Sequence, residues 1–331
     1  MKYILPLAAL LFSTLVNAVE IKLGDYKNRA DVNDFVEHMA RQSDYTEQEL
    51  VDLFSGVKKQ DHLFELLDKP AEKELQWFQY RHIFIKEKRI QQGVEFWREH
   101  ASLLSEISLK TGVPGEIIVA IIGVETFYGA YRGKDPVFDS LVTLAFDYPK
   151  RSAFFSRELE QLLLLAKEQN LDPRALRGSY AGAMGMPQFI ASSYRSYAVD
   201  FDGDGQANLF DSIPDIFASV ANYFVKHGWR PNEAVAGPLT ALENNSIDKL
   251  TPGIKTSYKW SDLAQNGLHS KTELDPDTAV ALVKLEQKNT TEYWVGLQNF
   301  YVITRYNHSE LYAMAVYQLS LLIKNRLRQE S

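Results

Sequence analysis

One glutamate lies on the most apolar predicted helix of the chain, where it has the properties of a proton donor. The helix is predicted over residues 114–128, because a proline begins this range and a glycine follows it. Glu125 is three or four residues from Ile121 and Ile122, so all three share one face. Desolvation on such a face raises the pKa of a carboxyl group. The alternative is a structural glutamate that pairs with a buried arginine or binds a neighbouring backbone.

A second segment, residues 179–189, combines small residues with hydrogen-bonding side chains. It reads Ser-Tyr-Ala-Gly-Ala-Met-Gly-Met-Pro-Gln-Phe. Exposed backbone at Gly182 and Gly185 allows close approach of a flat sugar ring. Ser179 is a candidate to hold the acid, and Gln188 is a candidate to bind hydroxyl or amide groups. A helix crossing through small residues would explain the segment equally well.

Three ordered motifs resemble the lytic murein transglycosylase B family. They are Gly-Val-Glu-Thr-Phe-Tyr-Gly at 123–129, Ser-Tyr-Ala-Gly-Ala-Met-Gly at 179–185 and Tyr-Val-Ile-Thr-Arg-Tyr-Asn at 301–307. The resemblance extends from about residue 70 to the C-terminus. It implies an α+β fold that is mainly α, with a lysozyme-like helical core from Ser102 to about Trp229. A flanking helical domain and a small antiparallel β domain complete the expected architecture.

The resemblance also implies a reaction. The family cleaves the β-1,4 bond between N-acetylmuramic acid and N-acetylglucosamine and leaves a 1,6-anhydro sugar. Most glycosidases need a second carboxylate as nucleophile or base, and in these motifs only Glu125 stands out. A single acid suffices if Glu125 protonates the leaving oxygen and then removes the proton of the muramoyl C6 hydroxyl as it closes on C1. We therefore expect a lyase that acts on peptidoglycan, with glycan strands as its partner.

Two other functions stay open at this point. A hydrolytic muramidase would use water in place of the C6 hydroxyl and would release reducing muramic acid. A calcium-stabilised glycan-binding protein would bind strands without cleaving them. The products released from murein distinguish all three.

Further site residues are carried over from the resemblance. It makes Ser179 a hydrogen-bond partner of Glu125. The residues implied to line the glycan groove are Tyr80, Gln188, Tyr223, Tyr306, Asn307 and Tyr312. Lys150 and Arg151 match a basic pair near the peptide-bearing subsites, although lysine at the first position lacks a bidentate fork. Met186-Pro187 replaces the family's usual Tyr-Gly before Gln188, which affects the expected shape of that subsite.

An aspartate-rich loop is predicted to bind a cation. Residues 200–206 read Asp-Phe-Asp-Gly-Asp-Gly-Gln, which matches the EF-hand opening, and Gln206 is placed to offer its carbonyl. The predicted ligands are Asp200, Asp202, Asp204 and Gln206, with Asp211 or Asp215 as the last. Asp211 occupies position twelve, whereas the longer loop of the resembled family points to Asp215. Oxygen ligands favour Ca²⁺ over Mg²⁺ here, in a structural role.

The remaining elements are mostly helices. We expect two amphipathic helices over 71–108, hinged near Gly93, after a break at Pro70. More helices are predicted at 154–168, 188–199, 214–227 and 312–328, and strands at 278–285 and 292–297. The expected domains are 19–101 (helical), 102–235 (catalytic core with the aspartate loop), 236–300 (small β domain) and 301–331 (a segment that completes the groove and the helical domain).

Composition excludes several other classes of protein. The chain has 331 residues, a formal net charge of −7 and no cysteine, so disulfides, thiolate metal sites and cysteine nucleophiles are excluded. The acidic balance argues against a nucleic-acid partner. Residues 1–18 have the pattern of a signal peptide, and beyond them no apolar run reaches the length of a membrane span. We therefore expect a periplasmic, soluble protein without a lipid-modified cysteine.

Overall fold

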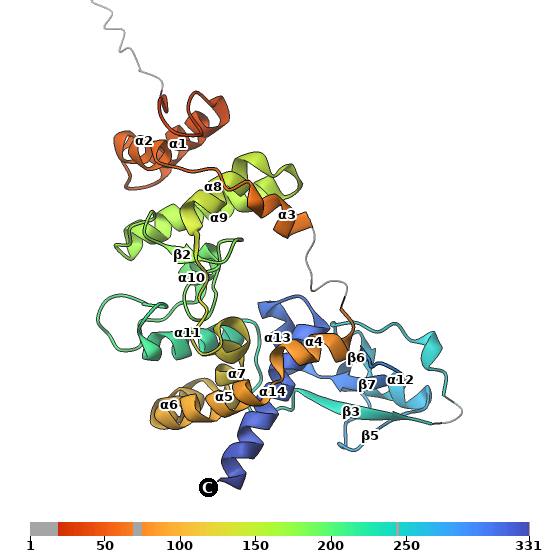
Figure 1. Cartoon of the computed structure of the whole chain (residues 1–331). Helices are drawn as coiled ribbons and strands as arrows, with labels where there is room; N and C mark the ends of the chain where they lie inside the picture. The colour runs from red at the N-terminus through yellow and green to blue at the C-terminus, as the bar shows by residue number, and fades with distance from the viewer. Residues whose placement is uncertain (1–18, 69–74, 243–244, 331) are drawn as a thin grey trace, which may run out of the picture. The chain divides into compact units, whose positions relative to one another are not determined.

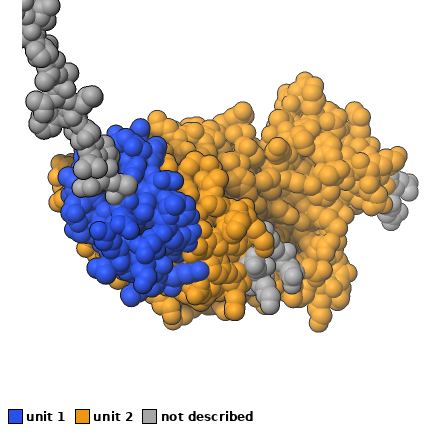
Figure 2. All heavy atoms as spheres, turned by 90° about the horizontal axis from the view of Figure 1, so that it is seen from above, with its two compact units in different colours: residues 1–59 blue, residues 60–331 orange. Residues whose placement is uncertain are grey.

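A computed structural model of the chain describes residues 19–68, 75–242 and 245–330. The predicted signal peptide and the predicted break at Pro70 lie outside the described residues. The fold is mainly helical with a small antiparallel sheet, as predicted. The chain divides into two compact units between Lys59 and Gln60 (Figure 2). The four predicted domain boundaries stay predictions.

The first unit contains helices α1 (Ala30–Gln42) and α2 (Glu47–Ser55). The residues of α1 that are buried have the spacing of one helix face and are Val32, Phe35, Val36 and Met39. α2 begins with a capping box, in which Thr46 accepts from the amide of Glu49 and the Glu49 carboxylate accepts from the amide of Thr46. The apolar faces of both helices form the core of this unit.

The second unit contains most of the helices. They are α3 (His62–Asp68), α4 (Trp77–Phe84), α5 (Glu87–Glu99), α6 (Ala101–Thr111), α7 (Gly115–Thr126), α8 (Val137–Asp147), α9 (Ser152–Glu168), α10 (Ala191–Tyr197), α11 (Ile213–Lys226), α12 (Trp260–Gln265), α13 (Gln298–Tyr306) and α14 (Glu310–Gln329). α8 packs on α9, and α14 passes along α7, α5 and α4 (Figure 1). Two short strands pair antiparallel within this unit: β1 (Asp135–Pro136) precedes α8, and β2 (Arg177–Gly178) follows α9.

α7 is the central helix of this unit. Every residue from Ile117 to Val124 is buried, because α5, α6, α11 and α14 all contact it. A helix that is apolar on all sides requires such surroundings. Among the described residues no single helix has the length and apolar character of a membrane span; α6 and α7 together meet that test, but they are bent by 113° at the break between them.

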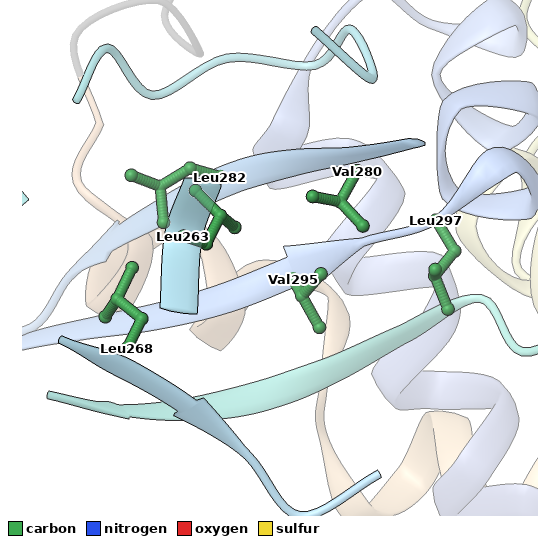
Figure 3. Packing of buried hydrophobic residues seen from close by; sticks show 6 residues of the cluster. All are labelled: Leu263, Leu268, Val280, Leu282, Val295 and Leu297. Atoms are coloured by element: carbon green, nitrogen blue, oxygen red, sulfur yellow. The ribbon is translucent and has the colours of Figure 1, made fainter. Parts of the chain in front are cut away.

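The small sheet contains five antiparallel strands in the order β4-β6-β7-β3-β5. These strands are β3 (Ala236–Ala241), β4 (Tyr258–Lys259), β5 (Leu268–Ser270), β6 (Ala279–Glu286) and β7 (Thr291–Gly296). The two predicted strands are therefore confirmed as β6 and β7. A cluster of buried side chains holds the sheet together, and it contains Leu263 of α12, Leu268, Val280, Leu282, Val295 and Leu297 (Figure 3).

The expected hinge at Gly93 is wrong. Three helices, α4, α5 and α6, lie in the described part of the predicted range, residues 75–108, and the breaks fall after Phe84 and at His100. Gly93 lies inside α5, where a Cβ atom would lie 2.4 Å from the hydroxyl oxygen of Tyr128. The glycine is therefore needed for close packing and not for a bend.

Candidate active site

Glu125 lies in the last turn of α7 and is half-buried. The isoleucines that share its predicted face are all buried. The hydroxyl of Tyr312 donates a hydrogen bond to Glu125 Oε1 across 187 residues of sequence. Tyr312 is 3% exposed and lies in the first turn of α14, whose start is capped by Ser309. The start of α14 therefore holds the carboxyl group at the end of α7.

Three more tyrosines surround this pair. The ring of Tyr306 is nearly parallel to that of Tyr312, with 6.5 Å between centroids, and Tyr223 lies 4.9 Å from Tyr306. Tyr306 donates its hydroxyl to the carbonyl of Pro187 at 2.7 Å, and Tyr223 donates to the carbonyl of Arg305 at 2.6 Å. Tyr80 of α4 is buried, and it lies close enough to Tyr312 to raise the pKa of that hydroxyl. Three of the predicted groove residues, Tyr223, Tyr306 and Tyr312, thus lie in one aromatic cluster beside Glu125.

The tyrosine hydroxyls of this cluster stay protonated at neutral pH. Burial raises the pKa of Tyr306 and Tyr312 well above the ordinary value, and the charge of Glu125 raises both further. Burial raises the pKa of Tyr223 to about 12. Tyr312 therefore donates to the carboxyl group as a neutral O–H, and its neighbours Tyr306 and Tyr223 add no negative charge beside it.

The chain makes an unusual turn directly after Glu125. Phe127, Tyr128 and Gly129 have φ angles of 52°, 59° and 88°, so all three adopt the left-handed region. This conformation costs on the order of 1 kcal/mol or more for each non-glycine residue. Hydrogen bonds hold the turn: Tyr128 donates its hydroxyl to the carbonyl of Arg89 at 2.8 Å, and the amide of Gly129 donates to Thr126 Oγ1 at 3.1 Å.

Gly123 makes room for the same tyrosine. A Cβ at Gly123 would lie 2.7 Å from Cζ of Tyr128. Packing against the ring of Tyr128 therefore explains the glycine at this position.

The predicted second segment forms a tight turn. Met184 and Phe189 exchange two backbone hydrogen bonds, of 2.9 and 3.0 Å, and enclose the turn. Gln188 lies within it with a φ of 53° and donates Nε2 to the carbonyls of Gly185 at 2.9 Å and Arg132 at 3.1 Å. The predicted helix start at Gln188 is therefore wrong, since the turn delays α10 to residue 191.

Ser179 stabilises its own loop. Its Oγ accepts from the amide of Ala183 at 3.0 Å, and its amide donates to the carbonyl of Ala183 at 2.8 Å. The hydrogen bond described for Glu125 comes instead from Tyr312. A direct interaction of Ser179 with Glu125 stays a prediction from the resemblance.

The other predicted substrate residues are exposed. Lys150 and Arg151 lie in a short 3₁₀ helix, Pro149–Arg151, and Asn307 follows the end of α13. The guanidinium of Arg151 lies 4.3 Å from the ring centroid of Phe154, in the first turn of the adjacent helix α9. Their roles toward a substrate therefore stay predictions.

The aspartate loop brings three carboxylates together. One oxygen each of Asp200, Asp202 and Asp204 lie within 4.8 Å of one another, and all three residues are exposed. Asp200 also accepts from the amides of Gly203 at 2.7 Å and Gly205 at 2.9 Å. The oxygen donors fit a hard cation such as Ca²⁺.

The remaining predicted ligands have other partners. The amide of Gln206 donates to Asp204 Oδ1 at 2.8 Å, and Asp211 is exposed and pairs with Arg132 at 3.0 Å. Asp215 is fully buried, and its carboxylate accepts at 2.8 Å from the amides of both Phe201 and Asn208. Asp215 thus closes the loop whether or not it also binds a cation.

Two residues of the site were missed by sequence reasoning. Thr126 donates Oγ1 to the carbonyl of Met186 at 2.9 Å, and Arg132 donates Nε to the carbonyl of Gly129 at 3.1 Å. Their partners are backbone carbonyls, which carry no sequence signal. Only the glycine-rich setting of Arg132 between Gly129 and Gly133 marked this stretch as unusual.

Comparisons with known proteins show which family the chain resembles. A family model described as the transglycosylase SLT domain matches residues 27–321. The membrane-bound lytic murein transglycosylase B of Escherichia coli (strain K12) is 42% identical over 305 residues, which are 89% of this chain and 83% of that protein. The catenated lytic transglycosylase SltB1 of Pseudomonas aeruginosa has a TM-score of 0.87 and 45% identity, covering 92% of this chain and 100% of that chain.

A third relative was solved with a cation. The Escherichia coli lytic transglycosylase Slt35 in complex with calcium has a TM-score of 0.87 and 41% identity, and the match covers 95% of this chain and 98% of that one. The family model spans the helix of Glu125, the turn at 184–189 and the aspartate loop, and these relatives cover 89% to 95% of the chain. The chain therefore belongs to the transglycosylase SLT family of lytic transglycosylases.

Proposed function

We propose that the protein is a peptidoglycan lytic transglycosylase. It cleaves the β-1,4 bond between N-acetylmuramic acid and N-acetylglucosamine and forms a 1,6-anhydro-N-acetylmuramic acid end. The observation that carries the proposal is Glu125 at the end of the buried helix α7, held by the hydroxyl of Tyr312. The name of the 42% identical relative, a lytic murein transglycosylase, supports the substrate class.

Glu125 acts first as the general acid. Protonated Glu125 donates its proton to the glycosidic oxygen as the bond from that oxygen to C1 breaks, so the N-acetylglucosamine side leaves as an alcohol. Tyr312 donates to Oε1 of Glu125, so its hydroxyl orients the carboxyl group for the proton transfer. The hydroxyl of Tyr312 also stabilises the carboxylate that forms.

Glu125 then acts as the general base. Its carboxylate accepts the proton of the muramoyl C6 hydroxyl while O6 bonds to C1, which closes the anhydro ring and restores the protonated acid. No water is consumed, so the two products together have the composition of the substrate. The buried tyrosines around Glu125 limit the access of water that would otherwise compete with O6.

The predicted groove residues bind the glycan in this proposal. Gln188 offers its amide oxygen from the 184–189 turn, since its Nε2 donates to backbone carbonyls. Tyr306 ends α13 and Asn307 follows it, next to this turn. Lys150 and Arg151 are exposed cations suited to the carboxylates of stem peptides.

Product analysis tests the proposal. Purified protein is incubated with murein, and the released muropeptides are weighed by mass spectrometry. We expect anhydro ends, each one water lighter than a reducing end, and reducing ends would instead identify a hydrolase. Glu125→Gln keeps the shape but removes the proton donor, so turnover should be lost. Glu116→Gln, on the same helix, alters a glutamate that pairs with Lys324 and should leave the products unchanged.

The aspartate loop is proposed to hold a structural calcium ion. Asp200, Asp202 and Asp204 would bind it, with the carbonyl of Gln206 and Asp215 completing the site. The calcium complex of the relative Slt35 supports this assignment. Asp211 fits less well, because it is already paired with Arg132. Thermal melts in chelator and in added Ca²⁺ test the site, since a bound ion must raise the melting temperature.

We propose that the enzyme acts in the periplasm after removal of residues 1–18. The signal-peptide pattern of these residues supports export, and peptidoglycan as substrate requires it. Fractionation of cells that produce the full chain, followed by N-terminal sequencing, should find a mature protein that begins at Val19. A product that still begins at Met1 in the cytoplasm would contradict this.

A further inference from the structure

We infer that Arg132 is a positioning residue, which holds Glu125 in place by clamping the turn after α7 to the exit of the aspartate loop. The exit segment is defined here as residues 208–211. The inference rests on the proposed function, since it concerns the placement of the same acid. It assigns to this loop a part in catalysis as well as in stability.

The first connection runs through the side chain of Arg132. Its Nε donates to the carbonyl of Gly129 at 3.1 Å, and its Nη1 donates to the carbonyl of Phe210 and to Asp211 Oδ1. A guanidinium is planar, and its donors have fixed directions. One rigid group therefore joins the turn to a segment 78 residues away.

A second connection reaches the other side of the same turn. The amide of Met186 donates to the carbonyl of Leu209 at 2.9 Å, and the carbonyl of Met186 accepts from Thr126 Oγ1 at 2.9 Å. The turn is thus attached to the exit segment on both sides, at Thr126 and at Gly129. Two attachments restrict rotation of the helix end, which one attachment alone would allow.

The exit segment is itself firmly held. The amide of Asn208 donates to the fully buried carboxylate of Asp215 at 2.8 Å, and the amide of Leu209 donates to the hydroxyl of Tyr194 at 3.0 Å. Burial raises the pKa of Tyr194 to about 12, so this hydroxyl stays neutral. The segment is therefore a fixed reference for the turn.

The turn requires such a reference because its conformation is strained. Phe127 and Tyr128 have positive φ angles, and release of this strain would rotate the last turn of α7, which carries Glu125. Gly129 leaves space for the clamp: a Cβ there would lie 2.7 Å from Met186 Cε and 3.3 Å from Arg132 Nη2. A displacement of about 1 Å at a reacting group can lower a rate about 100-fold.

The test compares Arg132→Met with Arg195→Met. Arg195 is an arginine that bonds Glu168 and Gln161 and has no described contact with the turn, so it controls for loss of a multiply bonded arginine. Release of anhydro products from soluble glycan strands is measured at several concentrations. We expect Arg132→Met to lower kcat about 10- to 100-fold with KM changed less than about 2-fold. Arg132→Lys keeps the positive charge and an N–H donor group but loses the planar fork, so it should recover part of the rate.

A second measurement, amide hydrogen exchange, reports on the turn after α7 and does not depend on enzyme activity. Hydrogen exchange of the amides of Gly129 and Tyr131, which bond to Thr126, should be faster in Arg132→Met and unchanged in Arg195→Met. An unchanged kcat, a raised KM with normal kcat, an equal loss in both variants, or unchanged exchange would each overturn the inference. If the wild-type protein released no anhydro product, the proposed function would fail, while the exchange result would still decide whether Arg132 clamps the turn.

Discussion

Replacing Tyr312 by phenylalanine removes the hydroxyl that donates to Glu125 Oε1. The ring remains, so its stacking with Tyr306 is preserved. Tyr312 is 3% exposed, and water has little space to replace the lost donor. The substitution therefore isolates one hydrogen bond of the proposed catalytic acid.

The expected loss follows from the strength of this bond. A hydrogen bond to a charged group contributes about 1.5–3 kcal/mol. The bond strengthens as Glu125 gives up its proton, so most of this energy stabilises the transition state rather than the bound substrate. Since about 1.4 kcal/mol corresponds to a tenfold change in rate, kcat of Tyr312→Phe should fall about 10- to 100-fold, with a smaller change in KM.

The assay is the initial rate of anhydro muropeptide release at several concentrations of soluble glycan strands. Tyr317→Phe is the matched control, because Tyr317 lies on the same helix and donates its hydroxyl to the carbonyl of Ala236 at 2.9 Å, away from Glu125. A wild-type kcat in Tyr312→Phe, or the same loss in both variants, would refute the reasoning.

Three further predictions concern stability. Asp215→Asn replaces a carboxylate that accepts backbone amides, so the free energy of unfolding in chelator should fall by about 3 kcal/mol, and an unchanged melt would contradict this. Tyr194 and Tyr223 have a pKa raised from 10.0 to about 12, so their contribution to the free energy of unfolding is complete below pH 10 and is lost as pH rises through 12. A melting temperature that stayed constant from pH 10 to pH 12 would contradict this prediction. Gly123→Ala adds a methyl group 2.7 Å from Tyr128 and should cost about 1–3 kcal/mol in a urea titration, unlike a substitution at an exposed site.

Several features were predictable because they depend on local spacing. The buried helix of Glu125, strands β6 and β7 and the cluster of three aspartates all follow from residues within a few positions of one another. The mainly helical fold with a small sheet followed from the resemblance of three motifs. A short segment is enough to predict such features, because the geometry of a helix or strand by itself sets the spacing of the side chains that share a face.

Errors arose where a local pattern had a distant cause. Gly93 was expected to mark a hinge, but the hydroxyl of Tyr128 needs the space. Gln188 was expected to begin a helix, but the paired backbone of Met184 and Phe189 places it in a turn. In each case a contact with a residue outside the local pattern decided the conformation or the packing, and local spacing contains no information about that contact.

The sequence by itself determined which residue is the candidate acid, which loop offers oxygen ligands and which family the chain resembles. Only the tertiary structure decided that Tyr312 holds Glu125 and that Arg132 and Thr126 clamp the turn after it. The physical reason is that helix periodicity relates residues three or four positions apart. A contact between Glu125 and Tyr312 instead depends on how α14 packs along α7, to which many residues outside both motifs contribute.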